Sequence, residues 1–149
     1  MSLDDEFQVL AVPGSMEPRH GWVGPFDPEA EAVWLPVVGP ACFVVWRRLA
    51  RELVERQGAT TTSAAELAAA AGLAVAPGRQ SGLMRSVRRL ERFGVAWSPR
   101  ARLLIVRCRL PALDDARLER LRPTIRQLQH ELRDVAGALA DERSSDPDS

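Results

Sequence analysis

Gln80-Ser-Gly-Leu-Met-Arg-Ser-Val-Arg-Arg-Leu-Glu-Arg-Phe93 is the stretch of sequence on which the fold depends. Leu83, Val87 and Leu90 recur at spacings of four and three residues, which predicts one apolar stripe of a helix. A solvated face would carry acids four residues from the bases, but Glu91 is the one acid in the stretch. We therefore expect a helix over 80–93 with a core face and a cationic face, the latter holding Ser81, Arg85, Arg88 and Arg92 with Arg89 beside them.

The charge of the chain is unevenly distributed, although its sum is zero. Residues 1–32 carry a net charge of −6, residues 33–110 carry +9 and residues 111–149 carry −3. A basic middle between acidic ends indicates an anionic partner such as nucleic acid. All 20 basic residues are arginine, which is typical of a GC-rich coding sequence, so the choice of arginine over lysine has little weight at any one position.

The length of 149 residues and the apolar content of 46% suit one domain with appendages. Cys42 and Cys108 stand far apart among apolar residues, so we expect buried reduced thiols, with one disulfide as the alternative.

No signal peptide or membrane-spanning run is visible, so we expect a cytoplasmic, nucleoid-associated protein without a membrane partner. Phosphate-binding glycine loops, a nucleophile elbow and zinc-spaced Cys/His clusters are missing, so we expect no catalysis, cofactor or metal.

Residues 1–33 form an acidic arm rich in Pro and Gly, which we expect to be unable to hold a long helix. Within it, Phe7–Val12 predicts a short strand. Trp22, Phe26 and Trp34 favour an arm that packs on the rest of the chain. A mobile arm that lies over the basic helix, or that binds a protein partner, is the alternative.

Two helices are expected before the basic helix. The first begins at Pro40, because proline is well tolerated at the first helical position. The second opens with the capping box Ser63-Ala-Ala-Glu66, consists mainly of alanine and ends at Gly72.

A linker of seven residues, 73–79, then leads into the basic helix. After that helix, residues 95–98 and 103–108 predict two strands around a turn, and the tip of this hairpin holds Arg100 and Arg102.

This order of elements over residues 34–110 resembles the winged helix-turn-helix DNA-binding proteins, and Leu90-Glu-Arg-Phe-Gly-Val95 fits the Leu-Glu-x-x-Gly-hydrophobic passage of that family. The resemblance implies a mainly α fold with a small β-hairpin (α+β). It also implies sequence-specific binding of double-stranded DNA by a transcriptional regulator, with the 80–93 helix in the major groove and the 95–108 hairpin as wing. The residues expected to contact DNA are Thr62, Ser63, Arg79, Gln80, Ser81, Arg85, Arg88, Arg89, Arg92, Arg100 and Arg102.

Residues 111–143 carry a second pattern, and residues 144–149 an acidic tail that we expect to be disordered. Apolar residues recur at alternating spacings of three and four, with Pro123 marking a break near the start of the long helix. The pattern predicts either a helix packed on its own domain or a homodimer interface. We favour the dimer because the seam is narrow and has charged flanks. The resemblance adds to this, since winged-helix regulators of the MarR and PadR kind also carry dimerising helices after the wing. The seam consists of Leu118, Leu121, Ile125, Leu128, Leu132, Val135 and Leu139.

We favour the interpretation that the protein is a dimeric winged-helix DNA-binding regulator. A winged-helix adaptor that binds other proteins, and a replication or partition protein that binds DNA, are the alternatives.

Overall fold

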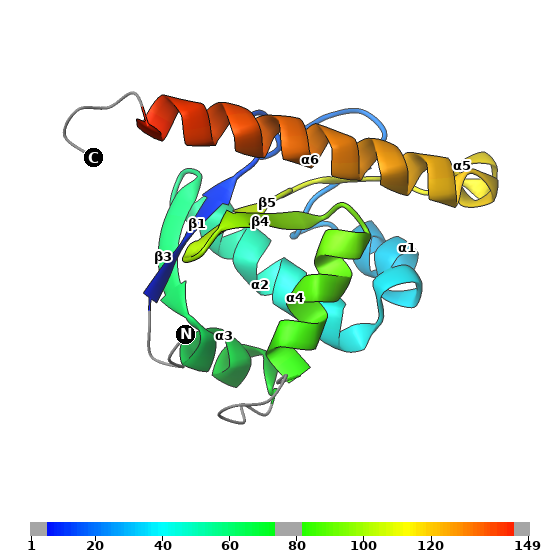
Figure 1. Cartoon of the computed structure of the whole chain (residues 1–149). Helices are drawn as coiled ribbons and strands as arrows, with labels where there is room; N and C mark the ends of the chain where they lie inside the picture. The colour runs from blue at the N-terminus through cyan, green and yellow to red at the C-terminus, as the bar shows by residue number, and fades with distance from the viewer. Residues whose placement is uncertain (1–5, 74–81, 145–149) are drawn as a thin grey trace.

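The structure, a computed structural model, describes residues 6–73 and 82–144 (Figure 1). It is an α+β fold in which one sheet lies between two helical layers. Helices α2 and α4 pack on one face of the sheet, and the long helix α6 covers the other. The elements are β1 (Glu6–Ala11), β2 (Trp22–Val23), α1 (Pro28–Val38), α2 (Pro40–Glu55), β3 (Ala59–Ser63), α3 (Ala64–Ala71), α4 (Gly82–Arg92), β4 (Ala96–Arg100), β5 (Leu103–Val106), β6 (Leu110–Pro111), α5 (Asp115–Glu119) and α6 (Leu121–Ser144).

The main sheet has four strands in the order β3-β1-β5-β4. Strand β1 is an inner strand, antiparallel to β3 and parallel to β5, and its Val9 pairs with Thr60 on one side and Leu104 on the other. The predicted hairpin is present as β4 and β5, but it makes up only half of the sheet. The expectation of a small hairpin was therefore wrong in extent, because two further strands extend it.

The N-terminal segment is packed, as expected, and its predicted strand is β1. It is not a separate arm, however, since β1 lies in the middle of the sheet. The expected boundary between residues 33 and 34 falls inside α1, an 11-residue helix that starts at Pro28. The expectation that proline excludes a long helix from this segment was wrong, because at the first helical position proline lacks only an N–H that has no partner in the helix anyway.

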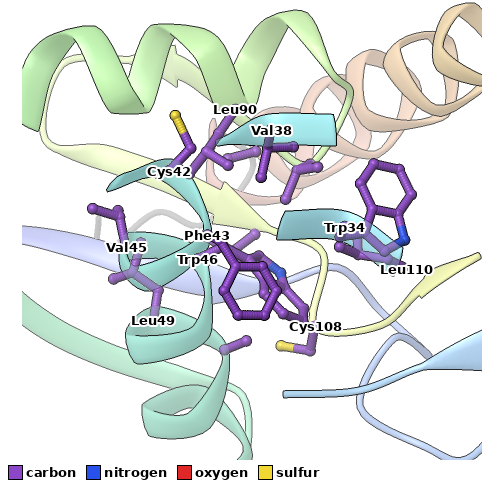
Figure 2. Close-up of a cluster of buried hydrophobic side chains, with 14 of the residues drawn as sticks. Trp34, Val38, Cys42, Phe43, Val45, Trp46, Leu49, Leu90, Cys108 and Leu110 are labelled. Atoms are coloured by element: carbon purple, nitrogen blue, oxygen red, sulfur yellow. The ribbon is translucent and has the colours of Figure 1, made fainter. Parts of the chain in front are cut away.

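The core on the α2 side of the sheet holds the largest buried side chains, among them Phe43, Trp46 and Leu49 of α2 and Leu90 of α4 (Figure 2). The indole of Trp46 donates a hydrogen bond of 2.8 Å to the carbonyl oxygen of Arg107. The buried indole is thus satisfied, and it links α2 to the segment after β5.

Cys42 and Cys108 are both buried in this core and both free, which confirms the expectation of unpaired thiols (Figure 2). Burial raises the pKa of both thiols. In the part of the chain that the structure describes, no helix combines the length and the apolar character needed to cross a bilayer.

Helix α5 ends at Glu119, and helix α6 starts at Leu121, so Pro123 stands in the first turn of α6. The break expected near Pro123 is therefore confirmed. Leu128 and Leu132 of the predicted seam are 3% and 1% exposed, because the chain's own sheet and α4 cover them. A coiled-coil partner would need the same side chains, so the preference for a dimer interface along this seam was wrong for these two residues. The alternative, packing within the domain, is what the structure has. Of the other seam residues, Leu118 is exposed, while Leu121, Ile125, Val135 and Leu139 are half-buried.

Candidate nucleic-acid interface

Helix α4 has the two faces that its sequence predicts. Leu83 and Leu90 are buried together with Ser86, whose hydroxyl donates to the carbonyl oxygen of Gly82 at 2.9 Å. The opposite face is exposed and carries a stripe of three arginines, Arg85, Arg88 and Arg92. We call these three residues the α4 stripe.

The α4 stripe differs in its lack of acidic partners from four other arginines of the described residues, which form ion pairs with carboxylates. Among the described residues, no ion pair joins any of its three guanidinium groups to a carboxylate. Arg88 does interact with the carboxylate of Glu91 through its charge. Burial raises the pKa of Glu91, and the positive charge of Arg88 partly offsets this rise. Elsewhere in the fold, ion pairs join Arg47 to Glu31 (3.4 Å), Arg56 to Glu52 (3.6 Å), Arg107 to Glu131 (3.3 Å) and Arg109 to Asp27 (3.8 Å).

Arg89, which we expected to contact DNA, has a structural role. Its Nε donates a hydrogen bond of 2.8 Å to the carbonyl oxygen of Val38, and its guanidinium lies 5.5 Å from the ring centre of Phe93. These contacts link α4 to the end of α1. The prediction that Arg89 belongs to the DNA surface is therefore not supported by its position.

The passage from α4 to the hairpin explains the Leu-Glu-x-x-Gly pattern in physical terms. Leu90 fills the core, and the carboxylate of Glu91 accepts a hydrogen bond of 3.2 Å from the backbone N–H of Ser98. Gly94 has a φ of +73°, and a Cβ there would lie 2.6 Å from the Cβ of Leu128 in α6. Only glycine fits both the backbone conformation and the contact with α6.

The hairpin tip carries the two arginines expected there, and both are exposed. Arg102 adopts a φ of +62° in the turn, and its carbonyl oxygen accepts a hydrogen bond of 2.8 Å from the N–H of Gln8. The hydroxyl of Ser98 lies 3.0 Å from the carbonyl oxygen of Arg100 and 2.9 Å from that of Leu103. The tip is therefore held in place by β1 and by its own backbone.

One arginine of the α4 stripe, Arg88, and one of the hairpin tip, Arg102, border the same cavity. This cavity of about 170 Å³ is lined mainly by apolar side chains of β1, α3, α4 and β5, and Ser98 of the hairpin also borders it. Since one hollow borders both elements, their cationic side chains can face one ligand together.

Thr62 and Ser63, which precede α3, are buried and are not placed to contact DNA as expected. Thr62 and Ser63 are each 6% exposed, and the Ser63 hydroxyl accepts a hydrogen bond of 3.1 Å from the N–H of Glu66. The Thr62 hydroxyl lies 3.4 Å from the carboxylate of Glu66, to which it donates. The capping box is thus confirmed, but these hydroxyls are engaged inside the fold, so the prediction that they contact DNA was wrong. Three further predicted contacts, Arg79, Gln80 and Ser81, lie outside the described residues.

Within the ranges described, no group of three His, Cys, Asp or Glu side chains is arranged to hold a metal ion. No protein-family model, curated protein or solved structure matches this chain. A function must therefore be inferred from the surface that α4 and the hairpin form.

Proposed function

We propose that the protein binds double-stranded DNA as a winged helix-turn-helix regulator, with α4 in the major groove and the β4–β5 hairpin as the wing. The observation that carries the proposal is the α4 stripe, whose three exposed arginines have no carboxylate partner in the described residues. The order of α2, α3, α4, β4 and β5 supports it, since this is the order of elements on which the resemblance rests.

The dimensions of α4 suit this role. A helix with its side chains is about 10–12 Å across, and the major groove of B-DNA is about 12 Å wide. Arg85 and Arg92 lie seven residues apart, or about 10 Å along the helix axis. Three guanidinium groups over this length can reach phosphates of the groove wall, and an arginine that reaches a guanine can bind its O6 and N7 together.

The hairpin would add contacts outside the major groove. Arg100 and Arg102 stand at its exposed tip, from which they can reach the phosphate backbone or the adjacent minor groove. Because the tip is anchored to β1, these contacts would require little rearrangement on binding.

The test is the affinity for a random duplex and for a selected preferred duplex, measured over a series of salt concentrations for the parent, Arg85→Ala and Arg88→Ala. Each variant should bind more weakly, by about 1–3 kcal/mol where the lost contact is to a base edge, while its melting temperature stays unchanged. Arg48→Ala is the matched control, because Arg48 is an exposed helical arginine beside a cavity that α2, β3 and α3 border.

Two results would count against the proposal. If both α4 variants bind like the parent and like Arg48→Ala, α4 is not the reading helix. If the parent shows no salt-dependent affinity for duplex DNA at all, the adaptor alternative gains, since counterion release accompanies DNA binding.

A further inference from the structure

We propose that α6 is a second DNA-binding element, in which Arg122 and Arg126 bind backbone phosphates beside the groove that α4 enters. The inference rests on the proposed function and deepens it. It also gives α6 a role other than the dimer interface that its seam first suggested.

One face of α6 carries Arg122, Arg126, Gln129 and Arg133, at successive spacings of four, three and four residues. Two of these side chains show where this face lies. The Gln129 amide donates a hydrogen bond to the carbonyl oxygen of Arg92 at the end of α4, and the Arg133 guanidinium lies 5.1 Å from the ring centre of Trp97 in β4. The basic face of α6 is therefore turned toward the C-terminal end of α4 and toward β4, and in Figure 1 helix α6 runs along β4 and β5 and passes the C-terminal end of α4.

The two helices are held in a fixed relation by a buried arginine. Arg107 is 5% exposed, and its guanidinium bonds the carbonyl oxygens of Gly94 (3.4 Å) and Leu128 (3.2 Å) and the carboxylate of Glu131 (3.3 Å). With the close contact between Gly94 and Leu128, this joins the end of α4 to the middle of α6. The arginines of the two helices thus belong to one preorganised surface, which lowers the cost of binding an extended ligand.

The charges of α6 are segregated around its axis. Asp134 lies roughly 140° from Gln129 around the helix, where it pairs with His130 at 3.6 Å. Glu131 is turned away from the basic face, toward Arg107. Arg122 and Arg126 are both exposed, and in the described part of the chain neither forms an ion pair with a carboxylate. A solvated helix whose charged residues were placed at random would carry acidic and basic side chains on every side.

Backbone phosphates are the ligand that this placement favours. Helix α6 covers the opposite face of the sheet from α4 but meets the C-terminal end of α4, where Gln129 bonds Arg92. Arg122 and Arg126 would therefore meet the phosphate wall beside the groove that α4 enters. Arg122 and Arg126 are about one helical turn apart, which lets the two guanidinium groups contact different phosphates of one strand. Such contacts position a protein on DNA without reading its sequence.

The experiment compares the parent with the double variant Arg122→Ala/Arg126→Ala in the same salt series, with Arg48→Ala as control. Each phosphate contact contributes about 0.9 to the slope of log affinity against log salt, so the double variant should lower this slope by about 1.8 and the control should not. Affinity for the random and the preferred duplex should fall by the same factor. Both substitutions are at exposed positions, and an unchanged melting temperature verifies the fold.

The outcomes separate the two proposals. If Arg85→Ala weakens binding and the double variant keeps the parental slope, α6 does not contact DNA, and the inference fails while the proposed function stands. If the double variant loses affinity for the preferred duplex alone, the contacts are to bases and the phosphate assignment is wrong. If the parent does not bind duplex DNA, both proposals fail.

Discussion

Raising the pH from 9 to 11 should destabilise this protein through its buried thiols. Burial raises the pKa of Cys108 from 9.0 to about 11, and it raises the pKa of Cys42 as well. The chain contains neither lysine nor tyrosine, and arginine stays protonated in this range. The two thiols are therefore the side chains that titrate between pH 9 and pH 11, so their contribution can be measured without interference.

The size of the effect follows from the shift of Cys108. In the unfolded chain a thiol ionises near pH 9, but in the fold Cys108 stays neutral until about pH 11. Its stabilising contribution is thus fully present below pH 9 and is lost as the pH rises to 11. Two pKa units correspond to about 2.7 kcal/mol once the thiol is fully ionised in the fold, and about 2 kcal/mol of this is lost between pH 9 and pH 11, with a further loss of the same sign from Cys42. Domains are stable by only about 5–15 kcal/mol, so this loss is large enough to measure.

Urea unfolding at pH 8, 9, 10 and 11, with reductant present, measures the loss. Cys108→Ala supplies the comparison, because it removes the titrating group. At pH 8 this variant should be less stable than the parent. Between pH 9 and pH 11, however, its free energy of unfolding should fall by about 2 kcal/mol less than that of the parent. Equal losses in the parent and in Cys108→Ala would refute the reasoning, since the thiol would then not be held neutral by the fold.

Two further predictions concern the packing that supports the site. Deletion of residues 1–33 should abolish cooperative thermal unfolding, followed by circular dichroism, because it removes the inner strand β1. A deletion variant that still unfolds cooperatively near the parental temperature would contradict the strand order. Gly94→Ala should lower the free energy of unfolding in urea by more than about 1 kcal/mol, since the new Cβ would meet Leu128 and alanine is strained at a positive φ. Gly72→Ala, where a Cβ meets nothing, separates the clash from the strain of the backbone.

The helices of the body could be predicted because their signals are local. Pro40 at a first helical position, the Ser63 cap with Glu66 three residues on, and the apolar spacing of α4 each depend on residues that are neighbours in the sequence. The hairpin was predicted for the same reason. These elements needed no knowledge of how distant segments pack.

The sheet could not be predicted in the same way, because its order depends on pairing between distant segments. The alternation of Phe7–Val12 predicted a strand, but nothing near it shows that β1 pairs with both β3 and β5. Strand β3 was missed altogether. Its run Thr60-Thr-Thr62 has the β-branched side chains of a strand, but it stands beside a helix cap, and from the sequence we expect Thr62 only as a DNA contact.

The seam of α6 shows a limit of periodicity as evidence. Apolar residues at spacings of three and four predict a buried stripe, but not whether a second helix or a sheet covers it. Here Leu132 packs with Val12 and Ile105 of the same chain, so the sheet covers it. Gly94 lets α6 approach because it has no side chain. In the sequence this glycine indicated only the passage from the helix to the hairpin, and not a contact with α6.

The candidate site shows why a count of arginines overstates a DNA surface. Every arginine from Arg85 to Arg92 looked equivalent in the sequence, but Arg89 bonds a backbone carbonyl and stacks on a ring, so it holds α4 in place. Arg107 is buried, and it joins α4 to α6 through two carbonyl oxygens. Under the proposed function, both residues would act through the geometry that they maintain. What separates the arginines that can bind phosphate from those that hold the fold is the partner of each guanidinium, and that depends on tertiary contacts that sequence spacing does not contain.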